Sequence, residues 1–198
     1  MDTSNTRIGE VVEAATTSFI AQSYELWELP ALGSLVKTES STLDLYGVVC
    51  RATTQGLEPG RRAIARGKDA PNEEAVFQTN PQLARLLKSE FAALVIGFKD
   101  KSSCRHYLPP HPARIHAFVY TCTPAEVEAF GAKLDFLGLI LRSVTDIPTE
   151  ELTAAVLREM ATAQPDGEAF LNQAGRELAR LLSKDYGRLK AILERIRP

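Results

Sequence analysis

The first part of the chain alternates apolar and polar residues over short runs, which is the period of β-strands. Glycine, proline and polar residues separate these runs, and several runs are partly apolar on both faces. This pattern favours a small closed barrel over an open sheet, with the last two strands closing what the first four begin. The six predicted strands cover residues 8–15, 17–26, 35–38, 43–53, 91–98 and 115–122.

The strand pattern is interrupted between the fourth and fifth runs. Residues 54–80 contain glycines, prolines and many charges, which predicts a long connection on the surface. Asn80 and Pro81 suit the cap and first position of a helix, and the leucines that follow give it an apolar stripe. Residues 54–90 are therefore predicted to be a loop and helix inserted into the barrel. Gly47, inside the fourth run, predicts a bulge or a sharp bend.

From residue 123 onward, the apolar residues recur at helical spacing. Thr123 and Glu126 form a capping-box pattern, and Pro124 suits the first helical position. Three later helices are predicted, over residues 148–163, 168–184 and 186–197. The chain is thus predicted to be α+β, with a β-barrel domain over residues 1–122 and a helical region over residues 123–198.

The last two predicted helices carry an apolar seam. Several of its residues are seven apart, which suits packing on another helix. Asp185 and Gly187 interrupt the seam, so a helical hairpin is favoured over one long coiled coil. A tryptophan beside Leu26 and Leu29 suits the rim of the barrel or an interface, where its ring would bury a large apolar area against a partner. The candidate interface residues are Trp27, Leu178, Leu182, Leu189 and Ile196.

Composition narrows the class of protein. The 198 residues are 44% hydrophobic and 24% charged with a net charge of -2, which argues against a disordered chain or a basic nucleic-acid tail. No run approaches the roughly 20 apolar residues that span a bilayer, and the polar start lacks the apolar core of a secretory signal. Three cysteines are too few for a disulfide framework. We therefore expect a cytoplasmic protein without a membrane partner.

Short motifs in the N-terminal part resemble a known domain. The segments IGEVV at residues 8–12, PALGSLV at 30–36 and LYGVV at 45–49 carry the likeness, together with residues 19–26. They resemble the HAS-barrel, which HerA-type DNA-translocating ATPases share with the N-terminal part of ATP-synthase catalytic-head subunits. The resemblance covers residues 8–53 and extends to the two later strands. It implies a barrel that packs subunits around a ring or contacts partners, and that performs no chemistry itself.

The ATPase motif of the HerA-type proteins is not found in this sequence. A phosphate-binding loop needs G-x-x-x-x-G-K-[ST], whose backbone amides and lysine hold the phosphates. Gly60 to Lys68 offers two glycines and a lysine, but the gap is too long and Asp69 replaces the hydroxyl residue. Residues 97–103 fail as well. We expect no enzyme activity, no catalytic residue and no cofactor.

Histidines and cysteines cluster within 19 residues. Imidazole nitrogens and thiolates are good zinc ligands, but the spacing C-x-H-x4-H-x4-H-x5-C matches no zinc motif. Cys104 and His106 are also the only local pair suited to thiol catalysis, which needs a base beside the thiolate. Buried structural cysteines and loop histidines are the alternative interpretation. The cluster comprises Cys104, His106, His111, His116 and Cys122.

A basic cluster lies in the predicted insertion. It is suited to contact phosphate or nucleic acid, although acidic neighbours offset its field and no aromatic stacking set is interleaved with it. Two further arginines would add to it if their loop meets the insertion. The candidate contacts are Arg61, Arg62, Arg66, Lys68, Arg105 and Arg114.

These observations lead to one expected function and two alternatives. The expected function is a non-enzymatic assembly or accessory module, acting as a homo-oligomer or with a separate HerA-like ATPase. A ring of symmetric subunits is the form that this would most naturally take. Binding of nucleic acid or a phosphate ligand through the basic cluster is the first alternative. A metal or thiol enzyme between Cys104 and Cys122 is the second.

Overall fold

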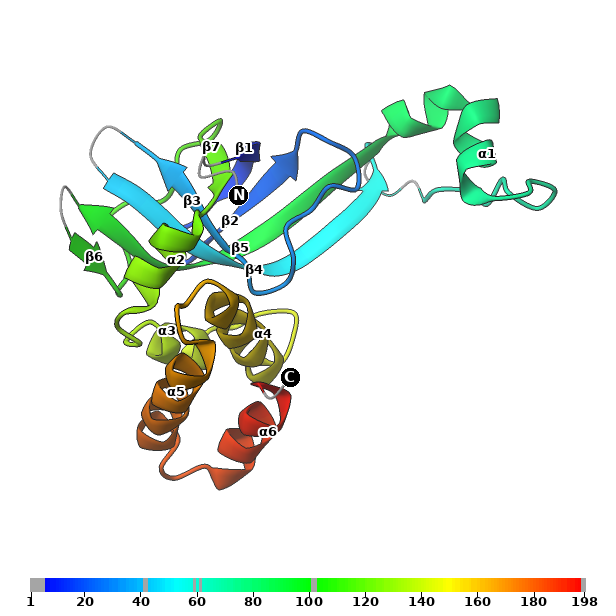
Figure 1. Ribbon diagram of the computed structural model, residues 1–198. Coiled ribbons are helices and arrows are strands. Elements are labelled where there is room, and N and C mark those ends of the chain that lie inside the picture. Colours follow the sequence, from blue (N-terminus) through cyan, green and yellow to red (C-terminus); the bar gives the residue numbers. More distant parts are fainter. Residues whose placement is uncertain (1–5, 41–42, 59, 61, 101–102, 197–198) are drawn as a thin grey trace.

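The computed structural model describes residues 6–40, 43–58, 60, 62–100 and 103–196 (Figure 1). Six antiparallel strands close into a barrel in the order β1-β2-β5-β4-β3-β7, and the short β6 extends the sheet beside β5. The α+β prediction and the barrel closure by the two later strands are confirmed. The strands are β1 (Arg7–Ala14), β2 (Ser18–Ser23), β3 (Leu35–Glu39), β4 (Leu43–Gly56), β5 (Leu87–Asp100), β6 (Ser103–Arg105) and β7 (Phe118–Thr121).

The predicted alternation on β4 holds, and both of its faces are buried for different reasons. Leu45 and Val49 point into the barrel, where they join a cluster that includes Phe19 and Phe91. Tyr46, Val48 and Cys50 point outward into a second cluster shared with the C-terminal helices. Burial on both faces therefore reflects a helical layer as well as barrel closure. The register shifts at Gly47, so the predicted bulge is confirmed.

The last predicted strand is too long. Residues 115–122 were expected to be extended, but β7 begins only at Phe118, because the chain turns just before it. His116 has a φ of 68°, a left-handed conformation that no strand accommodates. The second strand is also shorter than expected, since the chain turns after Ser23 and Trp27 has a φ of 68° as well.

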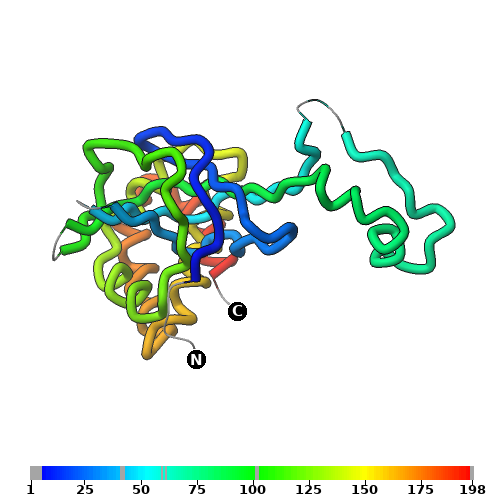
Figure 2. Tube along the Cα trace, turned by 90° about the horizontal axis from the view of Figure 1, so that it is seen from above, coloured from blue at the N-terminus to red at the C-terminus, as the bar shows by residue number. Residues whose placement is uncertain are grey.

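The insertion is a projecting arm rather than a surface loop and one helix. β4 and β5 stay paired beyond the barrel, from Thr53 opposite Glu90 to Gly56 opposite Leu87. The tip carries α1 (Glu73–Thr79) and the 3-10 helix η1 (Pro81–Leu86). It stands away from the barrel and the C-terminal helices, which together we call the body, in both views (Figures 1 and 2). We call residues 53–90 the arm. Asn80 does not cap η1 with its side chain, which instead donates to the Val76 carbonyl.

The C-terminal helices cover the outer face of β3, β4 and β5 (Figure 1). The capping box at Thr123 is confirmed, because its hydroxyl accepts from the Glu126 amide and the Glu126 carboxylate accepts from the Thr123 amide. None of the described helices is both long and apolar enough to cross a lipid bilayer. The helices are α2 (Pro124–Gly131), α3 (Leu137–Arg142), α4 (Thr149–Thr162), α5 (Gly167–Leu181) and α6 (Tyr186–Ile196).

A buried lysine joins the helices to the barrel. The ammonium group of Lys37, on β3, is buried and lies 2.7 Å from a Glu39 oxygen and 2.6 Å from a Glu126 oxygen. Burial alone would raise the pKa of Glu126, but the hydrogen bonds from Lys37 and from the Thr123 backbone outweigh it, so the pKa of Glu126 is lowered. This group ties the start of α2 to the barrel wall.

Candidate functional site

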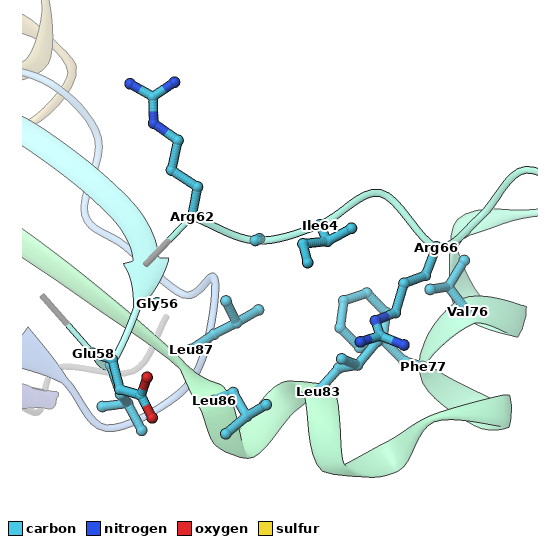
Figure 3. A pocket seen from close by; sticks show the side chains of 12 residues that line it. Gly56, Glu58, Arg62, Ile64, Arg66, Val76, Phe77, Leu83, Leu86 and Leu87 are labelled. Atoms are coloured by element: carbon cyan, nitrogen blue, oxygen red, sulfur yellow. The ribbon is translucent and has the colours of Figure 1, made fainter. Parts of the chain in front are cut away.

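The arm encloses an apolar groove of about 310 Å³ (Figure 3). The groove lies between the end of the paired strands β4 and β5, which we call the ribbon, the connection 62–66, α1 and η1. α1 begins at Asn72, whose side chain accepts a hydrogen bond from the Ala75 amide, and η1 follows directly after it. The walls are mostly aliphatic or aromatic. The principal apolar lining residues are Leu57, Ile64, Val76, Phe77, Leu83 and Leu86.

The apolar side chains of the arm are not covered by the rest of the chain. None of the described residues between Leu57 and Lys88 is buried, and neither α1 nor η1 has a buried residue. Ile64 is 73% exposed and Leu86 is 51% exposed. Exposed apolar residues that gather in one place mark interaction surfaces in soluble proteins, whereas isolated ones do not. The groove is therefore the strongest candidate binding surface in the described part of the chain.

Trp27 extends this surface onto the barrel. Its ring meets the ring of Phe77 edge to face, with the centroids 4.9 Å apart, and its amide donates to the Ser89 hydroxyl. The indole remains 54% exposed. A shallow depression lined by Trp27, Leu57 and Arg62 makes the surface continuous with the groove.

The predicted basic cluster is only partly assembled. Arg62 and Arg66 both line the groove; the Arg66 guanidinium lies over it, and Arg62 points away from it (Figure 3). Lys68 is exposed in the same connection, and Arg61 lies outside the described residues. Within the described chain, no ion pair involves Arg62, Arg66 or Lys68.

The two added arginines do not meet this cluster, which corrects the expectation that the loops join. Arg105, on β6, lies opposite Phe98 of β5, and its Nε atom is 3.6 Å from a carboxylate oxygen of Asp100. The ribbon of the arm ends at Leu87, eleven residues away from Phe98 along β5, which is about 36 Å of strand. Arg114 lies in the turn beside β1, next to a segment whose amide at His116 donates to the Val11 carbonyl.

The histidine and cysteine cluster does not form one site, although Cys104 and Cys122 pack against the same apolar cluster. His116 is hydrogen-bonded to the carboxylate of Glu10, and His111 is exposed in the loop before it. His106 packs against two phenylalanine rings, with centroids 4.5 Å from Phe130 and 5.5 Å from Phe136. The described residues include no group of three His, Cys, Asp or Glu side chains placed to hold a metal ion.

The cysteines are held as thiols. Burial raises the pKa of Cys50, of Cys104 and, most strongly, of Cys122. Burial also lowers the pKa of His106, which keeps its imidazole neutral. Residue 105 ends β6, so Cys104 and His106 do not share a strand, and no hydrogen bond joins them among the described contacts. A thiol of raised pKa is a poor nucleophile at neutral pH.

A second hollow, of about 730 Å³, lies between the barrel and the segment around α3. Arg51 and Asp146 form an ion pair at its wall, with 2.7 Å between nitrogen and oxygen. His106 also lines it, and the Nε2 atom of this imidazole is buried without a hydrogen-bond partner among the described residues. Besides this imidazole, the charged side chains of Asp135 and Arg142 line the hollow.

The predicted interface seam lies mostly inside the chain, which corrects its assignment as a partner surface. Leu178, Leu182 and Ile196 are buried, and Leu189 is half-buried against the same cluster. The seam does pack on another helix, as its spacing predicted, but α4 of the same chain is that helix. Trp27 is the one candidate interface residue that the structure leaves largely exposed.

The sequence patterns revealed only part of the apolar lining of the groove, the leucines that follow Pro81. Ile64 stands between basic residues, and Val76 and Phe77 follow two glutamates, so neither segment has a clear hydrophobic period. A scan against protein families finds no model that matches the chain, and a search of curated proteins finds no match. Function is therefore inferred from the geometry of the arm and from the N-terminal motifs.

Proposed function

We propose that this protein is a non-enzymatic assembly module whose arm makes protein–protein contacts. The observation that carries the proposal is the groove of the arm, with apolar walls that the chain itself leaves uncovered. Protein interfaces take their binding energy mainly from such apolar and aromatic anchors. The raised pKa values of the cysteines further support a role without thiol chemistry.

The resemblance of the N-terminal motifs to the HAS-barrel supports a partner class. In HerA-type ATPases the barrel precedes a motor core, whereas this sequence has no phosphate-binding loop motif. A separate HerA-like ATPase is therefore the proposed partner, and self-association is the second form that the assembly takes. Both use a surface with a central apolar anchor.

Co-expression with a HerA-like ATPase from the same genome tests this function. We expect the two proteins to elute together from a sizing column at a mass above that of either alone. Ile64→Asp should abolish the complex, because a carboxylate would lie in the apolar groove. Val144→Asp is the matched control, since Val144 is 100% exposed and lies outside the arm. Separate elution of the wild-type proteins, with no self-association, would overturn the proposal.

The alternative function is nucleic-acid binding through the basic residues of the same arm. Fluorescence anisotropy with labelled single-stranded DNA at about 50 and 200 mM salt separates the two functions, since phosphate contacts make affinity fall steeply with salt. We expect no salt-dependent binding, because Arg105 and Arg114 lie away from Arg62 and Arg66. Steep dependence that R62E/R66E removes would favour nucleic acid instead.

A further inference from the structure

The surface around the groove carries both charge signs. Arg62 and Arg66 lie at the groove, where Glu58 is the one acidic residue among the described lining. On the barrel side, Glu25 and Glu28 flank Trp27 in the chain and are exposed. No ion pair involves either glutamate among the described contacts. A basic apolar region and an acidic aromatic region therefore adjoin each other, joined by the contact of Trp27 with Phe77.

Such a surface is complementary to itself. In a two-fold contact between identical chains, each region of one copy meets the other region of its partner. Arg66, over the groove, and Arg62, at its edge, would then face the glutamates beside Trp27 of the second copy, twice in one dimer. The exposed apolar residues between them would be covered at the same time, which supplies the favourable free energy of association.

We infer that the arm is a homodimerisation element, and that the occupant of its groove is the Trp27 region of a second copy of this chain. This rests on the proposed assembly function and specifies its partner. Two-fold dimers are the commonest symmetric assemblies of soluble proteins.

Charge exchange tests the contact directly. Variant R62E/R66E has acidic residues at both regions, and variant E25R/E28R has basic residues at both regions. Each should dimerise more weakly than wild type by about tenfold or more, since like charges then face each other across the contact. R114E/K133E is the matched control for R62E/R66E, because it makes the same change in net charge at exposed positions outside the arm.

The decisive measurement is the solution mass of the two charge variants, alone and mixed. Light scattering behind a sizing column should give twice 21.7 kDa for wild type and for the control, and a mass closer to one chain for each variant alone at the same concentration. The equimolar mixture should return to the dimer mass, because both facing regions are again opposite in charge. The variant that carries all four changes should also dimerise. Circular dichroism melts of each variant verify that the body remains folded.

Three results would overturn the inference. Wild type could remain a monomer up to about 100 µM, a concentration at which even weak dimers with a dissociation constant near 10 µM are mostly formed. The dimer could persist in both charge variants, which would place the interface elsewhere. The mixture could fail to restore it. A monomer that still binds the ATPase through Ile64 would overturn this inference alone, whereas a dimer that binds no ATPase would overturn only the ATPase as partner.

Discussion

Gly33 shows most clearly how a single residue determines the contact between barrel and helices. It has a φ of 88°, and a Cβ atom built there would lie 2.5 Å from the backbone carbon of Ala155, on α4. Its amide donates to the Val49 carbonyl at 2.9 Å, which holds the turn against β4. The turn at residues 30–36 therefore needs glycine for two reasons, its backbone conformation and the close approach of α4.

Substitution at this position separates the two reasons. Gly33→Ala should lower the free energy of unfolding by more than about 2 kcal/mol, since it adds a backbone clash to conformational strain. Gly60→Ala is the control, because Gly60 also has a positive φ, of 79°, but nothing lies within 4 Å of its Cβ position. That variant should cost about 1 kcal/mol. Equal losses in urea unfolding would contradict the packing role of Gly33.

The ion pair of Lys37 and Glu126 makes the free energy of unfolding depend on pH in the acid range. Because the pKa of Glu126 is lower in the folded state than its ordinary 4.5, this carboxylate stabilises the fold above pH 4.5. That contribution is lost as the pH falls through the folded-state pKa. Glu126→Gln should therefore cost about 1–3 kcal/mol at pH 7 and flatten the acid part of the stability profile.

The other partner of Lys37 provides the comparison. Glu39 is 46% exposed at the side chain, so Glu39→Gln should change the unfolding free energy by less than about 1 kcal/mol. Urea melts of wild type and both variants between pH 3 and 7 measure the difference. If the unfolding free energy falls as steeply between pH 5 and 3 in Glu126→Gln as in wild type, other carboxylates cause the acid sensitivity.

At the scale of elements, the last two helices belong to the body. Their apolar seam packs on α4 and on the outer face of the barrel in one continuous cluster. Heptad spacing is satisfied by any helix that packs alongside, so it does not distinguish a neighbour in the same chain from one in another. The buried side chains Leu178 and Ile196 decide the matter, because a residue inside its own chain is not available to a partner.

Leucine truncation distinguishes core from surface. Leu178→Ala should cost about 2–5 kcal/mol, the range for a buried leucine whose cavity is only partly refilled. Leu86→Ala, in the arm, should change the monomer stability by less than about 1 kcal/mol because Leu86 is 51% exposed. The first variant should leave the solution mass unchanged. A shift of mass in Leu178→Ala without loss of stability would return the seam to the interface.

At the scale of the molecule, the body forms the hydrophobic core and the arm projects from it. The body contains both apolar clusters, and the arm contributes no buried residue beyond its ribbon among those described. The ribbon ends where the Leu57 amide donates to the Leu86 carbonyl at 2.8 Å, so the strands are close enough there to be joined directly. The fold of the body should therefore not depend on the tip of the arm.

Replacing residues 57–86 by an Asn-Gly turn tests this division, since that dipeptide closes antiparallel strands. We expect a folded protein with a melting temperature within about 4 °C of wild type, which corresponds to roughly 1 kcal/mol at this size. Circular dichroism and the dispersion of amide signals in NMR measure it. Loss of cooperative unfolding would mean that the arm stabilises the barrel as well.

The sequence by itself determined the six strands of the barrel, the capping box at Thr123 and the α+β class, but it did not predict the short β6. Alternation and helical spacing are local signals, because burial of the apolar face stabilises the strand or helix whose period the sequence matches. The ends of strands were less predictable: the turn at His116 shortens β7, and continued pairing with β5 lengthens β4. These depend on partners distant in the chain, which alternation does not record.

Only the tertiary structure decided what lies beside what. It separated Arg105 from Arg62, placed no three of the described histidines and cysteines to hold a metal ion, and gathered Ile64 and Phe77 into one groove. None of these outcomes has a local sequence signal, because each depends on how the β4–β5 ribbon leaves the barrel and where its tip folds back. Periodicity reports which face of an element is buried, and the path of the chain alone selects the neighbour that buries it.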